Sequence, residues 1–343
     1  MNDSIESHIS FKDSSMSNNI NERDSSKSAP WLSESTLGIK NLNFRLHNEI
    51  IEFYEYIKPN PKEHERRISI FESIRTILES NIKGAEVMAF GSFCTQLYLP
   101  GSDIDLVILN DRLTEAQLYR RTRKVIKECP YIFTNVTCVT TARVPIIKFT
   151  HLTSGIDFDI AFNQKAGIIN TKEIKKALVV HQELKYIFLT MKLFLRQRHL
   201  NSTYTGGIGS FLLFCMILAF LRNFKQKIYR QTNCLEKVDN LTLADYLINF
   251  LHFYGNFNIL GREIQITNGG SLSLKTETSF SFDLYSPIDP GMSIGAQAFK
   301  IKEVFSAFRN RHKILTNKQF KESASVLVEL VNPMKKDFQR YLA

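Results

Sequence analysis

Two aspartates at the start of a short apolar segment are the residues best suited to catalysis in this sequence. Asp103 and Asp105 open an apolar run that ends at Leu109. Residues two apart in a β-strand project from the same face. Carboxylates held side by side repel one another unless a cation lies between them, and oxygen ligands suit a hard divalent ion such as Mg²⁺. The pair therefore predicts a metal site with coordination positions left for substrate phosphates.

A turn suited to phosphate precedes the aspartates. The apolar segment 87–90 runs into Gly91 and Ser92, and the pattern predicts a short helix from there. Glycine lets an anion approach the backbone, the serine hydroxyl donates a hydrogen bond, and a helix N-terminus attracts negative charge. A Gly-Ser turn is usually a plain loop, and an Asp-x-Asp strand end is often only solubilising. Their close succession, with Pro100 and Gly101 between them, favours a nucleotide site.

The segment 155–163 supplies a third acid. Asp157 and Asp159 alternate with apolar residues there and share one face, so strand geometry leaves open which of them joins the first pair. Three carboxylates around two metals about 3.5–4 Å apart clamp the attacking and leaving oxygens of an in-line displacement. The implied reaction is nucleotidyl transfer with pyrophosphate as the leaving group.

The elements that must position these residues follow from hydrophobic periodicity. The pattern predicts a compact α+β region followed by a mostly helical one. The expected strands are 86–90, 104–109, 131–139, 144–149 and 156–162. The expected helices are 42–57, 62–80 (with Ile68, Ile70, Phe71, Ile74 and Leu78 as apolar positions), 114–128, 172–199, 207–224, 241–255, 298–309 and 317–342. Residues 262–296 are expected to form loops or a small hairpin.

The charge balance indicates a polyanionic ligand. The 343 residues carry 44 Lys and Arg against 34 Asp and Glu, a net charge of +10. Residues 1–30 are rich in serine and carry a net charge of −2, so the basic excess belongs to the body of the chain. Solvated helix faces are the plain alternative. The bases gather in three clusters: Arg120, Arg121, Arg123, Lys124 and Lys127; Lys185, Lys192, Arg196 and Arg198; Arg309, Arg311, Lys313, Lys318 and Lys321.

Composition excludes several other classes. A hydrophobic content of 43% and a charged content of 23% are typical of a globular protein. The longest apolar stretch, near 208–221, is too short to span a bilayer, and the first residues do not form a signal peptide, so a soluble intracellular protein is expected. The five cysteines form no Cys-x-x-Cys pair, which argues against a disulfide framework or a zinc knuckle. Any metal is expected to have oxygen ligands.

Four segments resemble one known family. They are Pro30-Trp31, the run from Leu97 to Asp105, the run 142–149, and the run 205–210. Together they are similar to the DNA polymerase β-like nucleotidyltransferases, specifically the Trf-type poly(A) polymerases that are the catalytic subunits of nuclear TRAMP complexes. The resemblance covers nearly everything after residue 30. It implies a catalytic palm domain of residues 60–168 inserted into a helical central domain of residues 31–59 and 169–343, after a disordered tail of residues 1–30.

The resemblance also implies roles for individual residues. Asp103, Asp105 and Asp159 match the metal-binding acids, which favours Asp159 over Asp157. The family's nucleotide contacts fall on Gly91, Ser92, Lys192 and Arg196 for the triphosphate, Asn170 for the ribose, Ser210 for phosphate and Phe211 for stacking on the base. In the loop that reads the base, Asp289 is kept, but Met292 and Ser293 replace asparagines. Methionine cannot read a base edge by paired hydrogen bonds, so base selectivity is an open question.

The leading hypothesis is a template-independent RNA 3′-terminal adenylyltransferase that uses ATP with Mg²⁺ or Mn²⁺. The resemblance implies a location in the nucleus and a role in RNA surveillance, in which short oligo(A) tails direct RNA to the exosome. It also implies a zinc-knuckle RNA-binding protein and an RNA helicase as partners. Two alternatives remain: a terminal uridylyltransferase, because of the altered loop, and a catalytically silent scaffold that binds RNA or partners.

Overall fold

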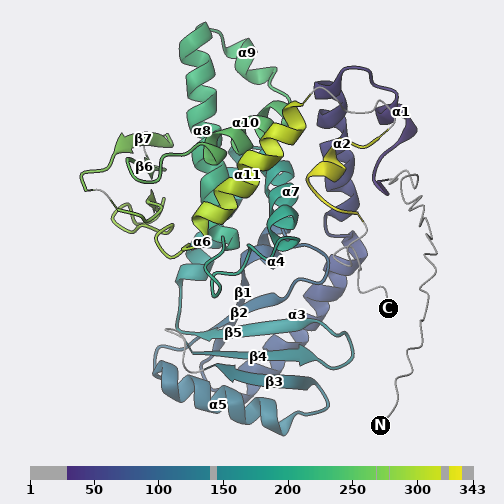
Figure 1. The fold of residues 1–343 in the computed structure, drawn as a ribbon. Coiled ribbons are helices and arrows are strands. Elements are labelled where there is room, and N and C mark those ends of the chain that lie inside the picture. Colours follow the sequence, from purple (N-terminus) through teal and green to yellow (C-terminus); the bar gives the residue numbers. More distant parts are fainter. Residues whose placement is uncertain (1–28, 140–144, 268, 278, 318–323, 334–343) are drawn as a thin grey trace, which may run out of the picture.

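The fold is described from a computed structural model (Figure 1). The structure describes residues 29–139, 145–267, 269–277, 279–317 and 324–333. The predicted tail of residues 1–30 lies outside the described residues except for its last two positions, as does the start of the run 142–149. A five-stranded sheet lies at one end of the molecule and a group of helices at the other (Figure 1).

The sheet has the strand order β1-β2-β5-β4-β3, in which only β2 and β5 run parallel. Its strands are β1 (Glu86–Phe90), β2 (Ile104–Leu109), β3 (Phe133–Val139), β4 (Ile146–His151) and β5 (Asp157–Phe162). Two helices cover one face: α3 (Pro61–Asn81) and α5 (Glu115–Glu128). Apolar side chains from both helices form one core with the inward residues of the strands. All five predicted strands are present, with ends shifted by at most two residues.

Helix α3 buries most of the predicted apolar stripe, but one position differs. Its buried residues are Arg67, Phe71, Ile74 and Leu78, at helical spacing. Ile68, which we expected on the apolar face, is 41% exposed, and the arginine beside it takes the buried position. The stripe is therefore apolar except at the end nearest the acidic residues.

The second core is built from two separate stretches of chain. It contains apolar residues from α2 (Leu42–Ile57), which precedes the sheet, and from the helices that follow the sheet. Those later helices are α6 (Ala166–Val180), α7 (Leu184–Arg196), α8 (Ser210–Thr232), α10 (Leu243–Gly255) and α11 (Ile301–Thr316); α1 (Glu34–Leu37) and α9 (Leu235–Asp239) are short. The region 262–296 contains the expected small hairpin, formed by the antiparallel strands β6 (Arg262–Gln265) and β7 (Ser271–Leu274), and a third short strand, β8 (Leu284–Tyr285), extends it into a small sheet.

Two helical predictions were wrong. The expected helix 172–199 is two helices, because His181 leaves the helical region (φ −120°, ψ 81°) and the chain restarts at Leu184. Of the expected helix 317–342, residues 318–323 and 334–342 lie outside the described residues; in the described part, Asn317 caps α11 and residues 324–333 contain only a 3₁₀ turn at Leu327–Glu329. There the carboxylate of Glu49 on α2 accepts the backbone N–H groups of Val326 and Leu327 at 2.9 and 3.2 Å, and so holds this segment against α2.

Two expectations from composition concern the cysteines and the length of apolar helices. All five cysteines are free thiols. Among the described residues, no helix combines the length and the apolar character that a bilayer span requires.

Candidate active site

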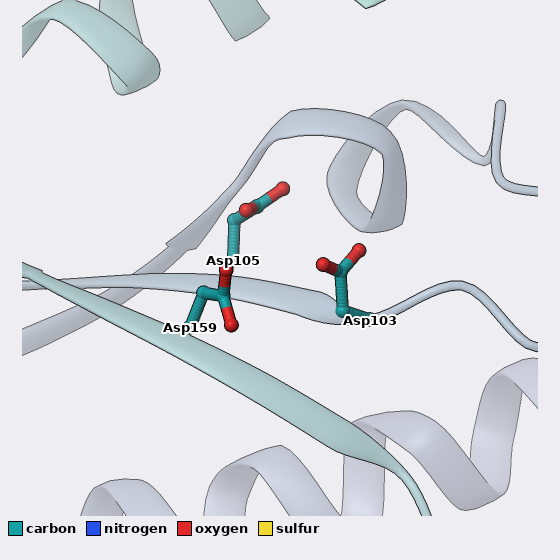
Figure 2. Close-up of side chains that lie close together, drawn as sticks. All are labelled: Asp103, Asp105 and Asp159. Atoms are coloured by element: carbon teal, nitrogen blue, oxygen red, sulfur yellow. The ribbon is translucent and has the colours of Figure 1, made fainter. Parts of the chain in front are cut away.

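Three carboxylates meet on the face of the sheet that α3 and α5 leave open. Asp103, Asp105 and Asp159 each offer an oxygen, and these atoms all lie within 4.8 Å of one another. Figure 2 shows Asp103 just before β2, Asp105 within β2, and Asp159 on the neighbouring strand β5. Oxygen donors at this separation fit a hard divalent cation, which prefers carboxylate ligands.

Strand register explains why these three meet. In the parallel pair, Asp105 lies directly opposite Asp159, and Asp103 precedes it by two residues on the same face. Asp157 lies two residues before Asp159, at the start of β5; it also lines the cavity described below, but it is exposed and accepts a hydrogen bond from the Thr150 hydroxyl at 2.6 Å. The structure thus brings Asp159, and not Asp157, to the first pair.

Burial and mutual repulsion both disfavour the charged forms of these acids. Burial, together with the charges of Asp103 and Asp159, raises the pKa of Asp105 from 3.8 to about 7. Burial also raises the pKa of Asp159, although its ion pair with Lys148 of β4 opposes that change. A bound cation would relieve this repulsion.

Gly91 lies where a side chain would not fit. Its φ is +69°, and a Cβ there would lie 2.7 Å from Oδ2 of Asp105. It begins the short helix α4 (Gly91–Thr95), and its N–H donates to the Thr171 hydroxyl at 2.7 Å. The glycine therefore lets the turn approach the carboxylate, and its own amide is already bonded within the protein.

Two cations from α7 face the acids. Lys192 Nζ donates to the carbonyl of Leu97 at 3.0 Å, and Arg196 Nη1 donates to the carbonyl of Pro100 at 3.1 Å. Burial lowers the pKa of Lys192 to about 8, while Asp103 and Asp105 favour its charged form. Spaced by four residues, both cations lie on one side of the helix and can act on one anion.

A cavity of about 730 Å³ joins these groups. Phe211, which we expected to stack on a base, is one of its walls and packs on Phe214. Ten of the eleven residues predicted for the site line this cavity: Gly91, Ser92, Asp103, Asp105, Asp159, Asn170, Lys192, Arg196, Ser210 and Phe211.

The structure places Asp289 apart from them. It is exposed on a turn, where its Oδ1 accepts the N–H of Gly291 at 3.1 Å. It is not among the residues that line the cavity. Met292 on the same turn is 49% exposed.

Lys148 is the main site residue that sequence reasoning missed. In register it lies between Asp159 on β5 and Thr137 on β3, so one cross-strand row runs from Asp105 through Asp159 and Lys148 to Thr137. All four line the cavity. In the predicted strand 144–149, alternation places Lys148 on the other face from its apolar neighbours Ile147 and Phe149. That alternation is the sequence signal that could have identified Lys148 as a site residue.

The basic clusters divide in the structure. The first lies on the exposed side of α5, which covers the sheet face away from the acids. In the second, Lys192 and Arg196 reach the cavity, whereas the guanidinium of Arg198 lies 3.8 Å from the centre of the Phe194 ring. The third lies on α11, and its last two members, Lys318 and Lys321, fall outside the described residues.

Comparisons with known proteins agree with this arrangement. Residues 46–176 match the model of the central palm domain of mitochondrial-like poly(A) RNA polymerases. The chain is 34% identical over 287 residues to the poly(A) RNA polymerase Cid14 of Cryptococcus neoformans, covering 81% of this chain and 37% of that protein. It is 33% identical over 305 residues to the poly(A) RNA polymerase protein 2 of Saccharomyces cerevisiae, covering 85% and 51%.

Among solved structures, the polymerase core of TRAMP, an RNA surveillance complex, matches with a TM-score of 0.74 and 29% identity, covering 86% of this chain and 96% of that one. The fold is that of the polymerase β-like nucleotidyltransferases, an α+β palm with a mostly helical region beside it, and the three clustered acids lie on the palm. The chain belongs to the Trf-type poly(A) RNA polymerase family. It spans between about a third and a half of the length of the curated relatives named above.

Proposed function

We propose that this protein is a template-independent RNA 3′-terminal adenylyltransferase that uses ATP. The observation that carries the proposal is the convergence of three carboxylates within 4.8 Å in a cavity that also contains Lys192 and Arg196. Acids for metal and cations for a triphosphate are the two requirements of nucleotidyl transfer. Family membership supports adenylate as the transferred group.

The chain's own residues would divide the work. Asp103, Asp105 and Asp159 would hold the divalent metals, Mg²⁺ or Mn²⁺, which when bound polarise the α-phosphate and favour ionisation of the RNA 3′-hydroxyl. Ser92, Lys192 and Arg196 would orient the triphosphate, with Gly91 keeping the turn close to Asp105. Ser210 would contact phosphate and Asn170 the ribose. Phe211 would offer a π-face to the base, a contact worth about 1–3 kcal/mol for stacked bases.

The domain division belongs to the same proposal. Residues 60–168 would form the catalytic domain, and residues 31–59 and 169–343 the helical domain. The cavity between them is lined from both, by β-strand residues such as Asp159 and by α7 residues such as Lys192. Two separate hydrophobic cores support this division.

The biological setting is proposed from the relatives alone. A TRAMP-like complex with a zinc-knuckle RNA-binding protein and an RNA helicase, and a nuclear role in marking RNA for decay, fit the solved TRAMP core that the chain resembles. Asp289 would take part in base recognition only after the turn that carries it approaches the cavity.

Incubation of the purified protein with a short single-stranded RNA, Mg²⁺ and each nucleoside triphosphate in turn tests the proposal. We expect extension with ATP, and none by an Asp105→Asn variant, which keeps the side-chain volume but removes the charge. Preferential incorporation of UTP would indicate a uridylyltransferase. Equal behaviour of the wild type and the variant, with no extension by either, would favour the silent scaffold.

A further inference from the structure

The loop between α4 and β2 is held by three cations. Residues 97–102 join these elements and lead directly into Asp103. Lys192 and Arg196 hold the carbonyls of Leu97 and Pro100 from α7. Arg67 holds the last carbonyl, that of Ser102, from α3: its Nη1 donates at 2.8 Å. The backbone just before the first acid is therefore fixed by hydrogen bonds from two helices.

Arg67 is built into the protein interior. It is 1% exposed, its Nε donates to Glu63 at 3.3 Å, and its guanidinium lies 4.7 Å from the centre of the Tyr98 ring. Tyr98 is itself 1% exposed, and its hydroxyl bonds to Nδ1 of His64 at 3.1 Å. The guanidinium thus has one orientation, aimed at the peptide bond between Ser102 and Asp103.

Stability alone does not account for an arginine at this place. It occupies the first position of the buried stripe of α3, and the other three positions are apolar. Its Nη2 is buried with no hydrogen-bond partner among the described residues, and an unpaired buried donor costs about 1–3 kcal/mol. A buried charge is seldom better for stability than an apolar side chain of similar volume.

The three anchors differ in what else they do. Under the proposed function, on which this step rests, Lys192 and Arg196 also bind the triphosphate, so their bonds to the loop compete with the nucleotide. Arg67 reaches the loop from α3 and does not line the cavity. It is the anchor that nucleotide binding leaves in place.

We propose that Arg67 is a positioning residue for the metal site: by holding the Ser102 carbonyl it fixes Asp103 at the distance from Asp105 and Asp159 that a divalent cation requires. It touches neither substrate nor metal. Partners one shell removed from a metal typically change metal affinity by about 10–100-fold when they are replaced.

The test compares Arg67→Met with Arg45→Met. Arg45 is a matched control, because it is also an arginine that is 1% exposed and donates to a backbone carbonyl, that of Ala324, but it lies in the helical core. Mn²⁺ binding, measured by the electron paramagnetic resonance signal of the free ion, is the first readout. The half-saturating Mg²⁺ concentration for RNA extension and the melting temperature are the second and third.

We expect both variants to change the melting temperature, but only Arg67→Met to weaken Mn²⁺ binding and raise the half-saturating Mg²⁺ concentration, each by about tenfold or more. Arg67→Lys, which keeps the positive charge and a donor nitrogen, should recover part of the affinity. Mn²⁺ affinity in Arg67→Met equal to that in Arg45→Met would overturn the proposal. If Arg67→Met does not fold, Arg67→Lys against Arg45→Lys makes the same comparison.

Failure of the proposed function has a different signature. A wild-type protein that binds Mn²⁺ through its acids, shown by loss of binding in Asp105→Asn, but extends no RNA would refute adenylyl transfer. The effect of Arg67 on Mn²⁺ binding would still be measurable in that protein.

Discussion

Replacing Asp105 by asparagine should stabilise the protein in the absence of metal while abolishing its activity. Asp105 lies among two other carboxylates in a buried position, and its pKa is raised from 3.8 to about 7. When the pKa of a carboxyl is higher in the folded than in the unfolded state, the protein loses stability as the pH rises from the unfolded-state pKa to the folded-state pKa. Ionised Asp105 therefore destabilises the metal-free protein above pH 7, and an amide does not.

The size of the effect follows from the two pKa values. At about 1.4 kcal/mol for each pH unit between 3.8 and 7, the cost is about 4 kcal/mol at pH 8. At pH 5 most of the folded protein is still protonated at Asp105, and the cost is less than about 2 kcal/mol. The advantage of the asparagine variant should thus grow between pH 5 and pH 8 and then level off.

Thermal unfolding in a metal chelator, at pH 5 and at pH 8, measures this. We expect Asp105→Asn to melt several degrees above the wild type at pH 8, with a smaller difference at pH 5. Added Mg²⁺ or Mn²⁺ should raise the melting temperature of the wild type and leave the variant unchanged, because a metal that binds only the folded state stabilises it. A variant that melts at or below the wild type at pH 8 without metal would refute the reasoning.

Four further substitutions test other parts of the site and fold. Lys192→Met should raise the KM for ATP by about tenfold or more with a smaller effect on the KM for RNA, measured by steady-state extension, because it removes a charge-assisted phosphate contact. Lys148→Met should lower the half-saturating Mg²⁺ concentration, because its ammonium no longer competes for the carboxylate of Asp159. Phe211→Ala should weaken nucleotide binding about tenfold, measured by calorimetry with a non-hydrolysable ATP analogue, through lost stacking. Glu49→Ala should lower the free energy of unfolding by about 3 kcal/mol or more, seen in urea titration, because it leaves several buried donors unpaired.

Much of the sheet could be predicted because its signal is local. Asp103 and Asp105 alternate with apolar residues, and alternation alone places both on one face. The choice between Asp157 and Asp159 was beyond that rule, since both share a face. The parallel register of β2 with β5 makes the choice, and register depends on contacts between distant segments.

The residues that sequence reasoning missed have the same origin. Lys148 reaches the acids only because β4 pairs with β5, and Arg67 reaches the loop only because α3 packs on the sheet. An arginine beside Ile68 gives no local sign that it is the buried member of the pair. The end of α6 before His181 also has no local signal, because the apolar periodicity of α6 continues into α7.

The interruption of the helical core by the sheet has a consequence for synthesis on the ribosome. The apolar stripe of α2, with Leu46, Ile50, Phe53 and Ile57, is buried against α7 and α10. Helix α7 begins at Leu184, 127 residues after α2 ends at Ile57. At about 5–20 residues per second, α2 waits roughly 6–25 s for its partner. During that interval the sheet can fold, while α2 presents an apolar face that a chaperone can bind.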